Sequence, residues 1–215
     1  CDRVVRRINA ERPDLVLMPG DFVYQHPDEA AELSPLERIT APVLAALGNH
    51  DYNRYEQGIT PQEGLDPVPY SDRIQEALES YDVTVLRDQV WEDNGLVIVG
   101  QEDWWYRPFT PINRLPDIDG ELTILLQHNP DGALIQELPD DIDLVLSGHT
   151  HGGQIRLPFI GAVPPLPMES DQSYDMGWFD TPHEAKLFIT KGIGETGPRA
   201  RLLAWPEIVI MDIRY

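Results

Sequence analysis

The sequence predicts an α/β fold in which two β-sheets pack together and helices cover the outside. In the first part of the chain, apolar runs of strand length alternate with segments that have helical periodicity. Later in the chain most apolar runs are short and are separated by glycine and proline, which is typical of strands joined by turns. A length of 215 residues fits one domain with a sizeable hydrophobic core.

The first expected element is an amphipathic helix over residues 2–12 that ends before Pro13 and leads to the strand before Asp21. A second helical segment over 27–40 ends before Pro42 and leads to the strand before Asn49. Residues 61–69 form a connection rich in proline and glycine, and a helix capped by Ser71 covers 71–81. The remaining elements are strands over 83–86, 90–91, 96–99, 122–127 and 142–146, a short helix over 131–138, and closing strands over 186–190 and 208–213.

Four of the apolar runs finish in side chains that can bind metal. The carboxyl ends of strands in open α/β sheets lie together and build the site, and imidazole is a common ligand of divalent transition metals. Taken alone, each residue has an ordinary explanation as part of a turn or loop, and their coincidence at strand ends predicts a metal site. The candidates are Asp21, Asn49, His50, Asp51 and His128, with His149 and His151 in the run Gly148–Gln154.

The order of these motifs resembles that of the calcineurin-like metallophosphoesterases. The sequence has Gly-Asp, then Gly-Asn-His-Asp, then a histidine at a strand end, then Gly-His-Thr-His. The continuation Gly-Gly-Gln-Ile-Arg-Leu-Pro resembles a branch of small bacterial phosphodiesterases, some of them membrane-associated. The resemblance runs from about the first residue to the last. It implies a four-layer αββα fold with two packed mixed sheets flanked by helices.

The resemblance also implies an activity, namely hydrolysis of a phosphomonoester or phosphodiester by metal-activated hydroxide. It implies two divalent metal ions, and this donor set does not distinguish Mn, Fe, Zn, Ni and Co. His50 would stabilise the charge of the scissile phosphate or protonate the leaving oxygen, and Asp51 would orient His50. The implied metal ligands are Asp21 as the bridge, Asn49, His128 and His149 on one ion, and His151 on the other.

The sequence departs from the family at its beginning. The family opens with an Asp-x-His motif at the end of its first strand, whereas residues 1–10 here have helical spacing and no histidine. We therefore expect residues 1–215 to be a single, N-terminally truncated domain without its first strand. One metal ion should bind tightly and a second weakly or not at all. Two alternatives stay open: a degenerate, non-catalytic metal-binding protein, and a one-metal hydrolase acting on something other than phosphate.

The net charge of −21 and a pI near 4.4 limit the partners. They argue against a general nucleic-acid surface and against a polybasic contact with anionic lipid, and leave a phosphoester as the expected substrate. Cys1 is the only cysteine, so no disulfide forms within the chain, and a lipid-bearing Cys1 would precede a linker rather than a helix. No apolar run approaches the length of about 20 residues that a helix needs to span a membrane. Peripheral membrane association of the full-length protein stays open. Cytoplasmic and membrane-associated locations and the oligomeric state are equally open.

Aromatic side chains and one long loop are candidates for substrate contacts. Residues 104–106 (Trp-Trp-Tyr) and the tyrosines Tyr52 and Tyr55 either line the pocket or serve as ordinary packing groups. Residues 157–174 form a long proline-rich segment, and loops of that length are often functional.

Overall fold

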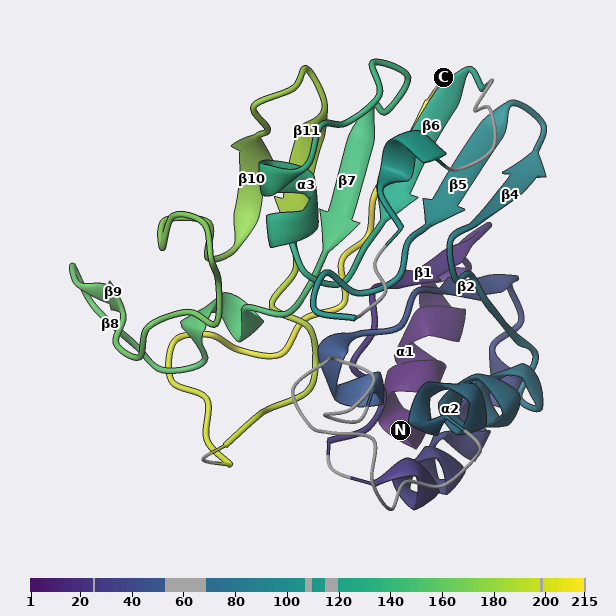
Figure 1. The fold of residues 1–215 in the computed structure, drawn as a ribbon. Coiled ribbons are helices and arrows are strands. Elements are labelled where there is room, and N and C mark those ends of the chain that lie inside the picture. Colours follow the sequence, from purple (N-terminus) through teal and green to yellow (C-terminus); the bar gives the residue numbers. More distant parts are fainter. Residues whose placement is uncertain (25, 53–68, 107–109, 115–119, 198, 215) are drawn as a thin grey trace.

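The computed structural model describes residues 1–24, 26–52, 69–106, 110–114, 120–197 and 199–214, which form two main β-sheets (Figure 1). The smaller sheet has the order β1-β2-β3 and the larger has the order β10-β11-β7-β6-β5-β4. The strands of the smaller sheet are β1 (Val16–Met18), β2 (Val43–Ala45) and β3 (Val83–Val85). Those of the larger are β4 (Gln89–Asp93), β5 (Leu96–Gly100), β6 (Leu122–Leu126), β7 (Leu144–Ser147), β10 (Gly177–Asp180) and β11 (Lys186–Ile189).

The expectation of an α/β fold is confirmed, and the larger sheet is mixed. Its edge strands β10 and β4 run antiparallel to their neighbours, and its four inner strands are parallel. The smaller sheet is parallel in its three described strands, so the expectation that both sheets are mixed is wrong for it. The reason lies in the connections, because η1 and α2 form crossovers between successive strands, as parallel pairing requires.

Helices lie on the outer sides of the sheets (Figure 1). The α-helices are α1 (Asp2–Glu11), α2 (Tyr70–Glu79) and α3 (Asp131–Ile135). The 3₁₀ segments are η1 (Pro27–Arg38), η2 (Asn49–Asp51), η3 (Ile112–Arg114) and η4 (His151–Gly153). A separate hairpin is made by β8 (Arg156–Leu157) and β9 (Gly161–Ala162). None of the described helices is both long and apolar enough to cross a membrane.

Alternate side chains of β2 show how the layers pack. Leu44 belongs to a buried cluster with Ile98 and Ile124 of the larger sheet, so the two sheets face each other there. Val43 and Ala45 point to the opposite side, in a cluster that includes residues of α1, η1 and α2. A third cluster joins the far face of the larger sheet to α3. The layers therefore run from helices through the smaller and the larger sheet to α3.

Two expected helices differ from the structure. Residues 27–38 form 3₁₀ turns rather than an α-helix, and Pro35 inside the segment has no N–H for an α-helical hydrogen bond. Helix α2 begins at Tyr70 with Pro69 as its cap residue, so Ser71 is not the cap. The Ser71 hydroxyl instead accepts a hydrogen bond of 3.2 Å from Arg87. The expected connection over 61–69 lies outside the described residues, apart from Pro69.

The largest difference concerns the end of the chain. Residues 208–213 were expected to close a sheet, but in the described part of the chain this segment belongs to no strand. Its β-branched side chains favour an extended backbone, but a strand also needs a neighbour with free N–H and C=O groups. Ile210 is accordingly 61% exposed. Conversely, β10 and the β8–β9 hairpin were not expected as strands, and α3 ends at Ile135 because Gln136 adopts an extended backbone.

Candidate metal centre

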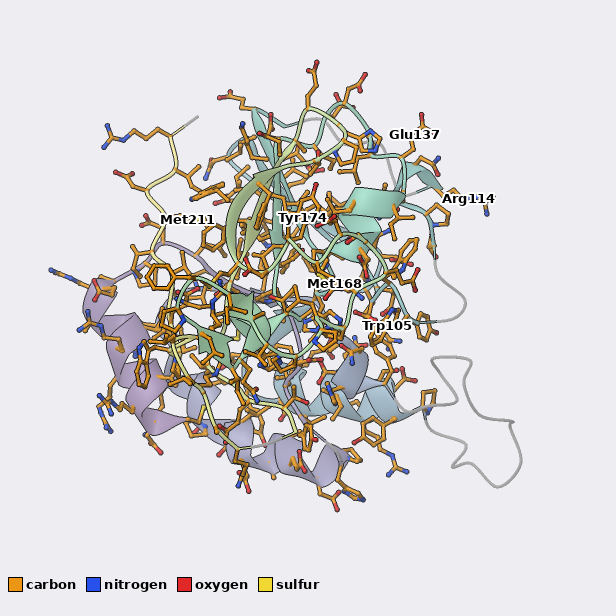
Figure 2. The ribbon with its side chains drawn as sticks, turned by 90° about the vertical axis from the view of Figure 1, so that its left-hand side faces the viewer. Trp105, Arg114, Glu137, Met168, Tyr174 and Met211 are labelled. Atoms are coloured by element: carbon orange, nitrogen blue, oxygen red, sulfur yellow. The ribbon has the colours of Figure 1, made fainter. Side chains whose placement is uncertain are left out.

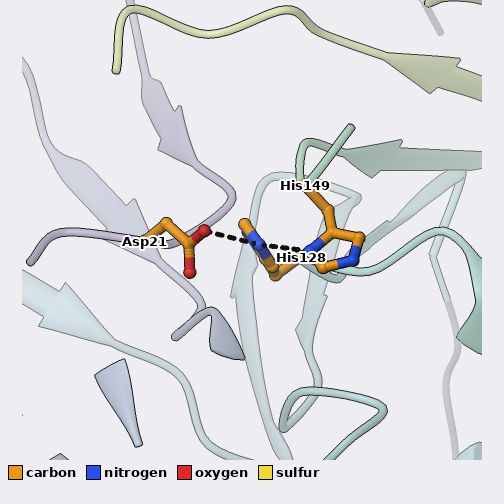
Figure 3. Close-up of side chains that lie close together, drawn as sticks. All are labelled: Asp21, His128 and His149. Carbon is orange, nitrogen blue, oxygen red and sulfur yellow. Dashed lines mark hydrogen bonds and ion pairs between the residues drawn. The ribbon is translucent and has the colours of Figure 1, made fainter. Parts of the chain in front are cut away.

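The carboxyl ends of three strands bring together three side chains that can bind metal. Asp21 follows β1, His128 follows β6 and His149 follows β7. The His128 Nε2 atom lies 3.1 Å from Asp21 Oδ2 and 3.2 Å from His149 Nδ1 (Figure 3). One ligand atom from each residue lies within 4.8 Å of the other two. Asp21, His128 and His149, expected from the sequence at a common site, do meet there.

Two backbone carbonyls fix which nitrogen of each ring faces this cluster. His128 Nδ1 lies 2.6 Å from the Pro19 carbonyl oxygen, and His149 Nε2 lies 2.7 Å from the Pro167 carbonyl oxygen. A carbonyl oxygen only accepts hydrogen bonds, so each of these nitrogens carries a proton. The remaining nitrogens, Nε2 of His128 and Nδ1 of His149, can therefore offer lone pairs to a cation. Carbonyl partners of this kind are usual for histidines that bind metal.

The spacing of the donor atoms fits one cation. Two ligands that each lie about 2.1 Å from a metal are about 3.0–3.4 Å apart at tetrahedral or octahedral angles. The separations of 3.1 Å and 3.2 Å fall in this range. Two neutral imidazoles with facing lone pairs also repel each other unless a positive charge lies between them. The ligand atoms of Asp21, His128 and His149, which all lie within 4.8 Å of one another, can therefore converge on one divalent metal ion.

The pKa values show that a proton serves as this positive charge when no metal is bound. Burial would lower the pKa of His128, but the neighbouring Asp21 carboxylate outweighs it and raises the pKa to about 9. Burial, reinforced by His128, lowers the pKa of His149 to about 3. Burial opposes ionisation of Asp21, yet His128 holds the pKa of this carboxyl below its ordinary value. The cluster thus consists of an imidazolium flanked by a carboxylate and a neutral imidazole.

The backbone at these residues adopts a conformation that is uncommon outside glycine. The φ angles are 60° at Asp21, 67° at His149 and 52° at His151. Such left-handed residues cost about 1–3 kcal/mol each, and they recur at functional sites, where the surrounding structure holds them. Gly48 is also necessary, since a Cβ atom there would lie 2.4 Å from Asp21 Oδ1 and 2.8 Å from His128 Cγ. The left-handed turns and the close approach at Gly48 therefore set the positions of the ligand side chains.

Asp51 is a buried anchor for the loops around the cluster. Its carboxylate accepts hydrogen bonds from the backbone N–H groups of Gly48, Asp21, Phe22 and Val23, at 2.8, 2.9, 2.8 and 3.2 Å. Burial, and secondly the Asp21 charge, raise the pKa of Asp51 to about 7. Asp51 thus ties the turn after β1 to the turn after β2.

The ring of His50 is oriented by a backbone carbonyl. His50 Nδ1 lies 2.9 Å from the Tyr24 carbonyl oxygen. The backbone N–H of His50 donates a hydrogen bond to Asp21 Oδ1 at 2.9 Å. The expectation that Asp51 orients His50 is therefore wrong, because the Asp51 carboxylate is occupied by backbone amides. Since Tyr24 receives the proton on Nδ1, Nε2 of His50 is the nitrogen that can exchange a proton with a substrate.

His151 lies outside the group of three ligands. Its Nδ1 lies 3.2 Å from Nη2 of Arg201 and 3.4 Å from the Gly194 carbonyl oxygen. A guanidinium can only donate, so this nitrogen accepts a hydrogen bond from Arg201. Burial lowers the pKa of His151. The Asp21 charge opposes this shift, and the Arg201 charge adds to it. Asn49 begins η2 directly after Gly48 and is 8% exposed.

Two segments that the ligand motifs do not mark cover the cluster. The ring of Trp105 contacts that of His149 edge-on, with centroids 4.9 Å apart. The other segment carries the Pro167 carbonyl and is held in place by Asp131 of α3. The Asp131 carboxylate accepts hydrogen bonds from the backbone N–H groups of Glu169 and Ser170 at 2.7 and 2.9 Å. Trp105 and Met168, labelled in Figure 2, mark these two segments.

The sequence marked the segments that carry Trp105 and Pro167 as candidates for substrate contacts but not their contacts with His149, and it did not mark Asp131. The unusual length of the 157–174 segment was the signal for Pro167, and no pattern in the sequence marked Asp131. Among the aromatic candidates, Tyr52 is 4% exposed and packs on Tyr106, so it is a packing group. Tyr55 lies outside the described residues.

Metal uptake at about pH 8 is expected to release about one proton per ion, because only His128 must lose a proton to become a ligand. Asp21 is already ionised and His149 already neutral at this pH. The affinity should rise with pH until the pKa of His128 near 9 is passed. Calorimetric titration in buffers of different ionisation enthalpy measures the proton count. A count of zero would contradict this protonation scheme.

The model of the family described as "Calcineurin-like phosphoesterase" matches residues 2–153, which contain the three clustered ligands. The chain belongs to the calcineurin-like phosphoesterases. Among phosphoesterases similar to it is an uncharacterized metallophosphoesterase of Campylobacter jejuni, 32% identical over 99% of this chain and 54% of the relative. This chain thus spans about half the length of that relative.

Two further relatives of this chain have names that specify an activity. Phosphodiesterase YaeI of Escherichia coli is 31% identical over 94% of this chain and 71% of its own length. The UDP-2,3-diacylglucosamine pyrophosphatase LpxG of Chlamydia trachomatis is 28% identical over 99% of this chain and 78% of its own length. The expected likeness to small bacterial phosphodiesterases is therefore confirmed.

Proposed function

We propose that this phosphoesterase hydrolyses a phosphomonoester or phosphodiester with the help of a divalent metal held by Asp21, His128 and His149. The observation that carries the proposal is the convergence of one carboxylate oxygen and two oriented imidazole nitrogens at separations suited to one cation. When bound, the metal would supply a Lewis acid that activates water and neutralises charge on the phosphate.

The protein's own groups would bind and orient the phosphate. His50 has Nε2 available, since its Nδ1 proton is committed to Tyr24. We assign to His50 the stabilisation of phosphate charge or the protonation of the leaving oxygen. Asp51 is a positioning residue that holds the turns carrying Asp21 and His50. Asn49 would add an amide oxygen to the ligands of the first metal.

A second metal ion would have fewer ligands here. Asp21 and His151 are the two expected contributors, and Nδ1 of His151 already accepts a hydrogen bond from Arg201. We therefore propose one tight ion and one weak ion for residues 1–215. The same observation favours the second candidate function, a metal-binding protein without turnover. Diphosphate and phosphodiester bonds, named in the activities of LpxG and YaeI, define the substrate classes to test.

The activity test compares bis-p-nitrophenyl phosphate, p-nitrophenyl phosphate and p-nitrophenyl acetate, each with added Mn²⁺ and with chelator. We expect metal-dependent release of nitrophenol from a phosphate ester. Cleavage of the acetate alone would contradict the phosphoesterase proposal. Tight metal binding without cleavage of any of the three would favour the non-catalytic alternative.

A further inference from the structure

The β8–β9 hairpin is an apolar projection on an acidic protein. Residues 157–168 contain no charged or polar side chain, in a chain of net charge −21. The hairpin projects from the body of the molecule (Figure 1). Its most exposed side chains are Phe159 at 109%, Ile160 at 72% and Val163 at 51%. Several large apolar side chains exposed together on one element are typical of a contact surface.

The backbone keeps these side chains exposed. Phe159 has a φ of 67°, an uncommon angle for a bulky residue, and it lies between β8 and β9 at the turn of the hairpin. The turn therefore fixes the direction of the Phe159 ring, which points into solvent. The hairpin tip is therefore a built feature of the fold.

The base of the hairpin is firmly attached to the metal-ligand loop. Arg156 Nη1 donates to the Gly152 carbonyl oxygen at 2.9 Å and to Asp175 Oδ2 at 2.5 Å, so its charge is neutralised. The Val163 N–H donates to the Ile155 carbonyl oxygen at 2.9 Å. A Cβ atom on Gly153 would lie 2.2 Å from the Cβ of Ala162, so the hairpin packs directly on the turn after His151. The base of the hairpin is thus anchored to the turn that follows His149 and His151.

We propose that this hairpin inserts its tip into the surface of a lipid bilayer whose headgroups carry no net charge. The exposed apolar side chains lie at the tip of a two-stranded hairpin, and fluid lipid receives them without a preformed groove. Insertion of exposed apolar side chains below the headgroups is favourable in proportion to the apolar area that leaves water. The chain beside the base supplies a further interfacial group, because residues 202–205, next to Ile155, include an exposed Trp205.

The charge of the protein selects the kind of bilayer. With a net charge of −21, the protein is repelled by an anionic membrane, and the hairpin has no free cation to offset this. Vesicles of phosphatidylcholine should therefore bind more protein than vesicles that also contain phosphatidylglycerol. Salt screens this repulsion, so the difference should shrink at high ionic strength.

The test is co-sedimentation of the 215-residue chain with vesicles of each composition, at low and high salt. The double variant Phe159→Ser with Ile160→Ser removes the tip without changing charge. The matched control is Trp178→Ser with Ile210→Ser, which removes an aromatic ring and an isoleucine that are 59% and 61% exposed elsewhere. We expect the tip variant to lower the partition coefficient on phosphatidylcholine by at least about tenfold and the control to leave it within about twofold.

Hydrolysis of a soluble nitrophenyl phosphate ester should be the same in both variants, which separates this proposal from the proposed activity. Failure of the unaltered chain to bind phosphatidylcholine vesicles would overturn the proposal. Equal losses in the tip variant and the control would overturn it as well. Light scattering that shows a dimer dissolved by the tip substitutions, without vesicle binding, would assign the hairpin to contact between copies instead.

Discussion

Replacement of His128 by alanine is expected to abolish tight metal binding and to lower phosphate ester hydrolysis by at least about 100-fold. His128 Nε2 lies 3.1 Å and 3.2 Å from the other two ligand atoms, so its loss removes the donor that both of them neighbour. Loss of groups that only support a ligand costs about 10–100-fold in metal affinity, and loss of a ligand should exceed this. Metal content after dialysis and kcat/KM measure the two effects.

The matched control is His183→Ala. His183 lies on a loop away from the cluster, and its Nε2 lies 3.0 Å from the Gln136 carbonyl oxygen, much as His128 contacts Pro19. This variant loses a histidine and a hydrogen bond but no ligand, so its metal content and activity should be unchanged. If His128→Ala kept its metal and its rate, the proposed centre would be wrong.

Replacement of Asp51 by alanine is expected to lower the free energy of unfolding by at least about 3 kcal/mol. The substitution leaves four backbone N–H groups without their acceptor at a position with no solvent exposure. It should also weaken metal binding, because Asp21 loses the contact that holds its turn. Urea unfolding of the metal-free protein at about pH 8, where Asp51 is ionised, measures the stability.

The control for this variant is Asp140→Ala, which removes the same charge from an exposed position. Its unfolding midpoint should match that of the unaltered chain within error. A loss for Asp51→Ala below about 1 kcal/mol would mean that water replaces the carboxylate without cost, and would contradict its role as an anchor.

The sequence was sufficient for those parts of the site that follow from where strands end. Asp21, His128 and His149 each come after an apolar run, and parallel strands place such positions at the same edge of the sheets. The Gly-rich run after β7 likewise predicted a tight turn, which the φ of 71° at Gly153 bears out. These features depend on periodicity and on local backbone preference, which the sequence records directly.

Side-chain partners were harder to predict, because they depend on the direction in which a turn points. Asp51 is adjacent to His50 in sequence, but the left-handed backbone of Asp21 brings amides of another turn to the Asp51 carboxylate. The segment over 208–213 shows the same limit for strands, since its composition favours extension without providing a neighbour. Pro167 reaches His149 through Asp131, a contact between residues 131 and 169 that no local pattern encodes.

Anomalous diffraction from crystals grown with Mn²⁺ tests the proposed metal centre most directly. We expect one strong peak in contact with Asp21 Oδ2, His128 Nε2 and His149 Nδ1, with His128 still hydrogen-bonded to Pro19 and His149 to Pro167. A weaker peak beside His151 is compatible with a second, loosely held ion. A strong peak elsewhere, with His128 and His149 still in direct contact, would contradict the assignment of these residues as the metal ligands.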